Sequence, residues 1–246
     1  MLAAGEGRRL RPLTWLRPKP LCPVGGRALV DLALDRARTV TPAVAVNLHH
    51  GRAAIEAHLA ADPSVHLSLE EGEALGTAGA VAHLRPWIDG RGVLVVNGDT
   101  WAPGDLTAAA AGWDRERVRL LVAGDDRLRP PERPASRIAA AFLPWGEVVR
   151  LEAVASGLWE ASWRALHAAG RLDVARWDGP CLDCGTPARY LAANLAGSEG
   201  APVVGEGCVV EGTVVRSVLW AGTRVRRGEV LVDAVRASDA VTVLVR

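Results

Sequence analysis

The chain has 246 residues, of which 49% are hydrophobic and 23% are charged, and its 29 basic and 28 acidic side chains leave a formal net charge of +1. This length suits one α/β domain with a small appendage, and the near-neutral charge excludes a broad basic surface for nucleic acid or anionic lipid. No apolar run is long enough to cross a bilayer and no secretion signal precedes the first motif, so we expect a cytoplasmic protein that binds neither membrane nor nucleic acid.

Most of the chain alternates between segments typical of strands and of helices. We expect strands at residues 44–46, 65–69, 93–96 and 118–123, and helices at residues 28–39, 52–61, 77–84 and 105–112, the third of them capped by Thr77. Beyond a loop rich in proline and arginine at residues 127–134, we expect strands near 137–142 and 147–152 and helices near 161–169 and 187–195. This alternation predicts an α/β fold with a Rossmann-like, doubly wound and mostly parallel sheet.

The pattern changes after Gly197. Valine pairs recur six residues apart at residues 203–204 and 209–210, with glycines between them. This spacing resembles the hexapeptide repeat of a left-handed parallel β-helix. We therefore expect a main domain over residues 1–197 and two or three short β-helix-like coils over residues 198–246, with a small β-hairpin cap as the alternative.

A loop rich in glycine and arginine follows the first apolar residues. Gly5 and Gly7 enclose one residue, which lets the backbone approach a phosphate and direct its N–H groups at it. Arg9 can bind phosphate oxygens through two parallel hydrogen bonds. Lys19 is the only lysine in the chain and lies between two prolines, which indicates a site that fits a compact ammonium and not a planar guanidinium. An arginine-rich surface turn is the alternative for residues 5–9 alone.

This loop and three later segments resemble the sugar-phosphate nucleotidylyltransferases. Residues 5–14 and 18–20 match the family signature G-x-G-x-R-L-x-P-L-T followed by P-K-P. Residues 75–79, 97–99 and 182–191 resemble the family's L-G-T-A-G, N-G-D and D-I-G-T-P-E-R-Y-L segments in the same order. The resemblance implies the nucleotide-diphospho-sugar transferase type of α/β fold, with the catalytic domain over residues 1–197. It also implies an enzyme that condenses a nucleoside triphosphate with a sugar 1-phosphate and releases pyrophosphate.

The resemblance assigns roles to individual residues. Arg9 and Lys19 would be catalytic, the first holding the leaving pyrophosphate and the second neutralising charge at the reacting phosphate. Asp99 and Asp183 would hold Mg²⁺, for which carboxylates are suitable hard ligands. Residues implied to bind the nucleotide are Ala4, Gly5, Gly7, Gly76, Thr77 and Gly98, and those implied to bind the sugar are Glu152 and Gly157. The family's E-K-P segment, which contacts the sugar phosphate, has no match in this sequence.

The substrates stay open at this point. Residues 75–79 favour an enzyme similar to the mannose-1-phosphate guanylyltransferases, which would bind GTP. The alternative is a uridylyltransferase or thymidylyltransferase of a hexose or amino-sugar 1-phosphate, which residues 97–101 also resemble. A non-catalytic regulatory protein that binds nucleotide sugars is an alternative of another class. The β-helix segments of the family further imply a homo-oligomer formed through the C-terminal segment.

Three remaining features carry weaker expectations. Cys181 and Cys184 form a C-x-x-C without a second cysteine pair nearby, so we do not expect a zinc or redox site. His49 and His50 are expected to end a strand and not to bind a metal. The family resemblance also implies that the central first strand is shortened at Met1, as a start codon assigned too late would produce.

Overall fold

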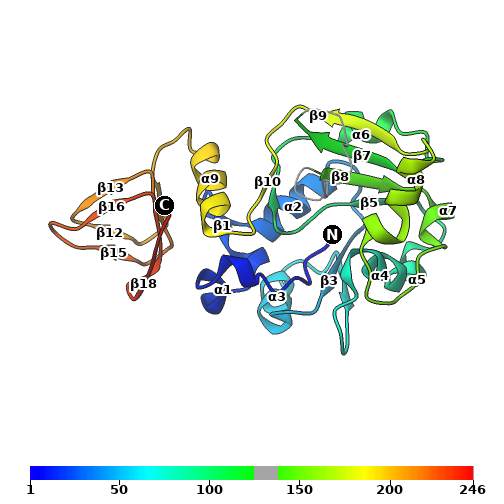
Figure 1. The fold of residues 1–246 in the computed structure, drawn as a ribbon. Helices are drawn as coiled ribbons and strands as arrows, with labels where there is room; N and C mark the ends of the chain where they lie inside the picture. Colours follow the sequence, from blue (N-terminus) through cyan, green and yellow to red (C-terminus); the bar gives the residue numbers. More distant parts are fainter. Residues whose placement is uncertain (125–137, 246) are drawn as a thin grey trace.

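A computed structural model of the chain describes residues 1–124 and 138–245, so the loop expected at residues 127–134 lies outside the described residues. The chain forms a larger α/β body and a smaller stack of β-strands, with helix α9 (Pro187–Gly197) between them (Figure 1). None of the helices in the described ranges is long and apolar enough to span a membrane.

The α/β body contains all the strands and helices expected before residue 124. Its helical segments are η1 (Arg8–Leu10), α1 (Leu13–Leu16), η2 (Lys19–Leu21), α2 (Leu29–Arg38), α3 (Arg52–Leu59), α4 (Gly76–His83), α5 (Arg85–Ile88), α6 (Thr107–Ala111), α7 (Trp145–Val148), η4 (Trp159–Trp163) and α8 (Arg164–Ala168). Its strands are β1 (Pro23–Val24), β2 (Arg27–Ala28), β3 (Val44–Leu48), β4 (Val65–Leu69), β5 (Val93–Val95), β6 (Thr100–Trp101), β7 (Arg119–Ala123), β8 (Ile138–Leu143), β9 (Asp173–Trp177) and β10 (Leu182–Asp183).

The main sheet is mostly parallel and is assembled around the N-terminal residues. β3 pairs with β4 in parallel, and a second set runs in the order β5-β8-β7-β9, in which β8 is antiparallel to both of its neighbours. Leu2 joins the two sets through parallel bridges to Asn47 and Asn97. Leu2 therefore lies between the two sets at the centre of the sheet.

Helices cover both faces of this sheet, which confirms the doubly wound prediction. Alternate residues of β3 point to opposite faces, as the two-residue period of a strand requires. Val44, Val46 and Leu48 belong to one buried cluster together with residues of α2 and α3. Ala45 belongs to a second buried cluster together with residues of α4 and α8. The carboxyl ends of β4 and β5 lead into the segments at residues 75–79 and 97–99.

Two of the local predictions are wrong. Residues 147–152 were expected to form a strand, but α7 begins directly after Pro144 and ends at Val148, and residues 149–152 form a turn and irregular structure. Thr77 does not cap α4, because Leu75 is the residue at the N-cap position. The Thr77 hydroxyl oxygen instead accepts a hydrogen bond from the backbone N–H of Leu158 at 2.8 Å. Thr77 thus ties α4 to the segment before η4.

The C-terminal segment stacks short strands in parallel, coil upon coil. Its strands are β11 (Val203–Val204), β12 (Val209–Val210), β13 (Thr213–Val215), β14 (Val218–Leu219), β15 (Arg224–Val225), β16 (Val230–Val232), β17 (Ala234–Ser238) and β18 (Val241–Leu244). β11, β12 and β13 pair in parallel with β14, β15 and β16, and β14 pairs in parallel with β17. This arrangement is that of a β-helix, and only its last two strands, β17 and β18, form an antiparallel hairpin. The hexapeptide spacing and the hand of the coil stay predictions.

These coils pack directly against the N-terminal loop. Trp220, which is 2% exposed, shares one buried cluster with Leu10 and Leu13 of the loop and with Tyr190 of α9. The Trp220 indole N–H donates to the Tyr190 hydroxyl at 2.9 Å, and that hydroxyl donates to the carbonyl of Pro23. The Arg17 guanidinium lies 4.5 Å from the centre of the Trp220 ring. The division at residues 197 and 198 stays a prediction, and a shared core crosses it.

We expect Trp220→Ala to destabilise the protein strongly, because it empties a closely packed site and removes the hydrogen bond to Tyr190. The expected loss in the free energy of unfolding is about 3–5 kcal/mol, measured from urea unfolding. Trp15→Ala is the matched control, since the Trp15 side chain is 72% exposed. Equal stabilities of the two variants would contradict this account of the core.

Candidate active site

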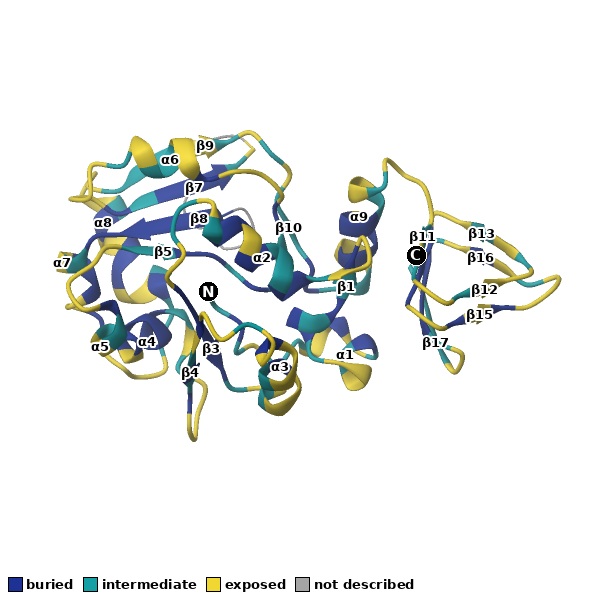
Figure 2. Cartoon of the chain, turned by 180° about the vertical axis from the view of Figure 1, so that it is seen from behind, coloured by how far each residue is buried: buried dark blue, intermediate teal, exposed yellow. Residues whose placement is uncertain are grey.

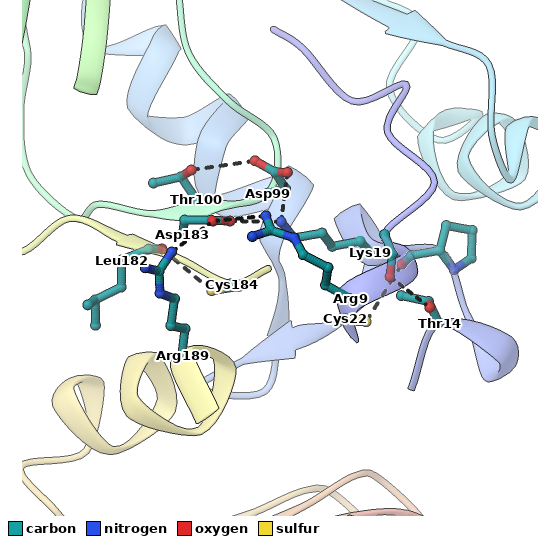
Figure 3. Close-up of polar contacts among 12 residues, drawn as sticks. Arg9, Thr14, Lys19, Cys22, Asp99, Thr100, Leu182, Asp183, Cys184 and Arg189 are labelled. Carbon is teal, nitrogen blue, oxygen red and sulfur yellow. Dashed lines mark hydrogen bonds and ion pairs between the residues drawn. The ribbon is translucent and has the colours of Figure 1, made fainter. Parts of the chain in front are cut away.

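A buried lysine lies between two aspartates at the centre of the candidate site. The Lys19 ammonium donates hydrogen bonds to Asp99 Oδ2 at 2.8 Å and to Asp183 Oδ1 at 2.9 Å (Figure 3). The Lys19 side chain is only 6% exposed, whereas those of Asp99 and Asp183 are 34% and 18% exposed. The two carboxylates therefore remain accessible to a ligand from one side while the ammonium supports them from within the protein.

Pairing between strands far apart in the sequence and one short turn bring these three residues together. Asp99 follows the end of β5, and Asp183 is the last residue of β10. β10 pairs antiparallel with β6 so that Asp183 lies opposite Thr100, and the Cys184 N–H donates to the carbonyl of Asp99 at 3.2 Å. This pairing holds the two carboxylates at one edge of the sheet. Lys19 begins the single turn η2, where the prolines on both sides limit its backbone.

The charge of Lys19 is stabilised by its partners. Burial by itself lowers the pKa of the Lys19 ammonium, because the charged form loses water. The attraction of Asp99 and Asp183 and the hydrogen bonds to both carboxylates outweigh that effect, so the pKa of Lys19 is raised above its ordinary value. Lys19 is therefore a permanent positive charge at neutral pH and does not act as a base.

Two arginines approach Asp183 from the solvent side. Arg9 and Arg189 place a terminal nitrogen 3.6 Å and 3.3 Å from Asp183 Oδ2 (Figure 3). Their side chains are 70% and 50% exposed, and ion pairs this exposed contribute little to stability. Both guanidinium groups are thus free to leave Asp183 for a better anion. Phosphate oxygens are such a partner, since guanidinium groups bind them in a bidentate manner.

A cavity of about 590 Å³ connects the predicted residues. Eight of them line it, namely Ala4, Gly5, Arg9, Lys19, Gly76, Thr77, Asp99 and Asp183. The sequence motifs did not assign a role to six further lining residues, which are Leu2, Asn47, Ala74, Asn97, Thr100 and Arg189. Arg189 lies within the segment at residues 182–191, but the sequence did not indicate that its side chain reaches the site. In the structure Arg189 lies in the first turn of α9, and its guanidinium group contacts Asp183. A separate cavity of about 680 Å³ lies near Met1 and contains none of the predicted residues.

Four predicted residues do not line this cavity. Gly7 supports the loop from behind: its φ is +67°, and a Cβ there would lie 2.9 Å from Thr14 Cγ2 and 3.1 Å from Lys19 Cβ. The Gly98 N–H is already used, because it donates to the carbonyl of Leu2 at 2.9 Å. Glu152 is exposed and lines none of the cavities described here. Their contacts with a ligand stay predictions.

The fourth residue, Gly157, lies beside the main cavity. It lines a smaller pocket of about 190 Å³ together with Trp159 and Trp163, and the two cavities share Thr77 and Asn97. Gly76 packs closely against this region, because its φ is +68° and a Cβ there would lie 2.5 Å from the carbonyl oxygen of Ser156. The loop at residues 75–79 and the loop at residues 154–157 therefore form one continuous wall.

The donor set at the centre suits a magnesium ion. Mg²⁺ is commonly held by one or two carboxylates together with substrate phosphates and water. Asp99 and Asp183 offer such a pair at the mouth of the cavity. Within the described ranges no group of three or more histidine, cysteine or acidic residues forms a fuller metal site. The residues present thus fit a metal that is completed by its substrate.

The cysteine and histidine pairs each contact other parts of the protein. Cys181 packs against the cluster of α2 and α3, whereas Cys184 belongs to the cluster around Tyr190. Burial raises the pKa of Cys181 to about 11 and that of Cys184 to about 12, so neither is a reactive thiolate at neutral pH. His49 Nε2 contacts the carbonyl of Gly72 at 2.8 Å, and His50 Nε2 lies 3.9 Å from a Glu6 carboxylate oxygen.

Comparison with known proteins agrees with this geometry. The family model described as nucleotidyl transferase matches residues 1–125, half of the chain, including the N-terminal loop and Asp99. The chain belongs to the nucleotidyl transferase family.

Individual members of the nucleotidyl transferase family show where the similarity lies. The chain is 42% identical over 134 residues to an N-acetylmuramate alpha-1-phosphate uridylyltransferase of Caulobacter vibrioides, covering 50% of this chain and 55% of that protein. It is 39% identical over 114 residues to a protein of the same name from Neisseria meningitidis serogroup B, covering 44% and 49%. The matches therefore span about half the length of these relatives.

The fold resemblance extends further along the chain. A UDP-glucose pyrophosphorylase structure from Acinetobacter baumanii superposes with a TM-score of 0.60 at 15% identity, covering 80% of this chain and 91% of that one. At this identity the similarity concerns the fold alone. It supports the nucleotide-diphospho-sugar transferase type of α/β architecture for this member of the nucleotidyl transferase family.

Proposed function

We propose that the protein transfers a nucleotidyl group from a nucleoside triphosphate to a sugar 1-phosphate and releases pyrophosphate. The observation that carries the proposal is the Lys19 ammonium between Asp99 and Asp183, at one wall of a cavity that is also lined by Gly5 and Arg9. A buried cation, two metal-binding carboxylates and a phosphate-binding loop are the components that a displacement at phosphorus needs.

In the proposed reaction an oxygen of the sugar phosphate attacks the α-phosphorus of the triphosphate. A new P–O bond forms while the bond to pyrophosphate breaks, and the electron pair leaves with the pyrophosphate oxygen. The attacking phosphate is already ionised, so the site needs no general base. Catalysis then rests on positioning and on neutralising charge.

Each residue of the cavity has a defined task in this scheme. The backbone at Gly5 and the guanidinium groups of Arg9 and Arg189 hold the β- and γ-phosphates. Lys19 stabilises the charge that develops around the reacting phosphorus and keeps Asp99 and Asp183 in place. Mg²⁺ bound by these carboxylates would supply further charge neutralisation on the phosphate oxygens.

The relatives favour uridine as the base. Residues 75–79 had favoured a guanylyltransferase, with a uridylyltransferase of an amino-sugar phosphate as the alternative. Both relatives described above are named as uridylyltransferases of N-acetylmuramate 1-phosphate. We therefore propose UTP and an N-acylated hexosamine 1-phosphate as the substrates. The pocket beside Gly157, with Trp159 and Trp163, offers an apolar space next to the cavity that suits an acyl group.

A non-catalytic sensor of nucleotide sugars is the less favoured function. Such a protein needs to bind the nucleotide sugar but does not need a buried cation at the reacting phosphorus. Burying Lys19 requires both aspartates to be in place, which is costly without a catalytic role. The complete arrangement of Lys19, Asp99 and Asp183 therefore supports the enzyme.

We also propose that the C-terminal coils join two or more copies of the chain. Val215, Val230 and Val232 lie on the paired strands β13 and β16 and are 41%, 62% and 47% exposed. Both strands lie in the part of the coils that is turned away from α9 (Figure 2). Light scattering should give a mass above that of one chain for the wild type. Val230→Glu combined with Val232→Glu should lower it, and Val149→Glu on the α/β body should not. A monomeric wild type would contradict this proposal.

The direct test of the activity is pyrophosphate release from a panel of triphosphates and sugar 1-phosphates in the presence of Mg²⁺. We expect the highest kcat/KM with UTP and an N-acylated hexosamine 1-phosphate, and little release when either substrate or the metal is omitted. Turnover with GTP and mannose 1-phosphate instead would show that the nucleotidyl transfer is right and the choice of base is wrong. Binding of a nucleotide sugar without turnover of any pair would contradict the enzyme.

A further inference from the structure

Two buried polar residues below the cavity connect the loops that form it. Asn47 is the one residue of β3 that lines the cavity, and Glu70 directly follows β4. The Asn47 side-chain oxygen accepts a hydrogen bond from the Ala3 N–H at 2.8 Å, and its amide nitrogen donates to Glu70 Oε1 at 2.6 Å. Glu70 Oε2 accepts from the Leu75 N–H at 2.9 Å. The hydrogen bonds thus run from residue 3 to residue 75.

The same connection continues to a third loop. The carbonyl of Leu75 accepts from the Ser156 N–H at 3.0 Å, and the carbonyl of Ser156 accepts from the Ala78 N–H at 3.0 Å. Ala3 precedes the phosphate-binding loop, Leu75 precedes Gly76, and Ser156 precedes Gly157. One continuous set of hydrogen bonds therefore fixes the spacing of the three loops that border the cavity.

The direction of every hydrogen bond in this set is determined. The N–H groups of Ala3 and Leu75 can only donate, so an acceptor has to face each of them. Asn47 therefore turns its oxygen toward Ala3 and its nitrogen toward Glu70. Glu70 then needs two acceptor oxygens, which an ionised carboxylate provides. Asn47 and Glu70 are 2% and 4% exposed, and an unmatched polar group at such a depth is costly.

We propose that Asn47 and Glu70 are positioning residues, which hold the phosphate-binding loop and the loop at residues 75–79 at the separation that nucleotidyl transfer requires. The inference rests on the proposed function. Glu70 does not line the cavity, and it acts through the backbone of Leu75 and through Asn47. Reacting groups that are misplaced by about 1 Å can lose about 100-fold in rate, so this connection controls activity without touching the reacting atoms.

The test exchanges the two functional groups. Glu70→Gln places an amide nitrogen where an acceptor is needed, and Asn47→Asp places two carboxylates against each other. Combining both substitutions restores every hydrogen bond with the acid and the amide exchanged. The carboxylate at residue 47 accepts from the Ala3 N–H and from the side-chain amide nitrogen at residue 70. The side-chain amide oxygen at residue 70 accepts from the Leu75 N–H. The double variant also keeps the net charge of this pair.

We expect each single variant to lower kcat/KM for UTP by about 10- to 100-fold and the double variant to recover to within about threefold of the wild type. Glu147→Gln is the matched control, because Glu147 is also buried and accepts a hydrogen bond from the Ser162 hydroxyl at 2.6 Å, outside the cavity. The control should lower the melting temperature but leave kcat/KM unchanged.

Two results would overturn the proposal. The first is that Glu70→Gln lowers only the melting temperature, as the control does. The second is that the double variant is no more active than the single ones. If the wild type turns over no substrate pair, the proposed function fails. The loop spacing is then tested by the calorimetric affinity for UTP with Mg²⁺, compared among the wild type, the two single variants and the double variant. Equal UTP affinities in all variants would contradict it.

Discussion

The double ion pair of Lys19 with Asp99 and Asp183 is the interaction on which the remaining structure depends. An ammonium that is 6% exposed needs its charge balanced at short range. Its partners come from segments far apart in the sequence, so the loop before β1, the end of β5 and the strand before α9 must converge. The antiparallel pairing of β6 with β10 exists at this junction. The same convergence leaves two carboxylates and two exposed arginines around one cavity.

The C-terminal coils support this centre from the opposite side. Trp220, Val218 and Val235 complete the buried cluster beneath the N-terminal loop, and the hydrogen bonds from Trp220 through Tyr190 reach the carbonyl of Pro23. The loop that carries Lys19 is therefore held between the sheet and the coils. Because the cluster contains residues from both sides of residue 197, the coils stabilise the loop that carries Lys19.

Local pattern was sufficient for much of this structure. Strands with β-branched runs and helices with regular apolar spacing were predicted within a few residues, and the motifs identified Lys19, Asp99 and Asp183 before their contacts were known. Other features were not predictable from local pattern. The segment at residues 147–152 forms the end of helix α7 and a turn where a strand was expected, and Thr77 bonds to Leu158 instead of capping its own helix. Asn47 and Glu70 belong to no motif of their own, because their role arises only when β3 and β4 lie side by side.

The central claim is that Lys19 and the two aspartates act as one unit in nucleotidyl transfer. Rates of pyrophosphate release under single-turnover conditions test it most directly, for Lys19→Met, Asp183→Asn and the variant with both changes. When several groups act as a unit, removing one of them already removes most of the rate enhancement that they supply together, so a second removal has little further effect. We expect each single change to lower the rate by about 1000-fold, and the double change to lower it no further. Losses that multiply, or near-normal rates with Lys19→Met, would contradict the account.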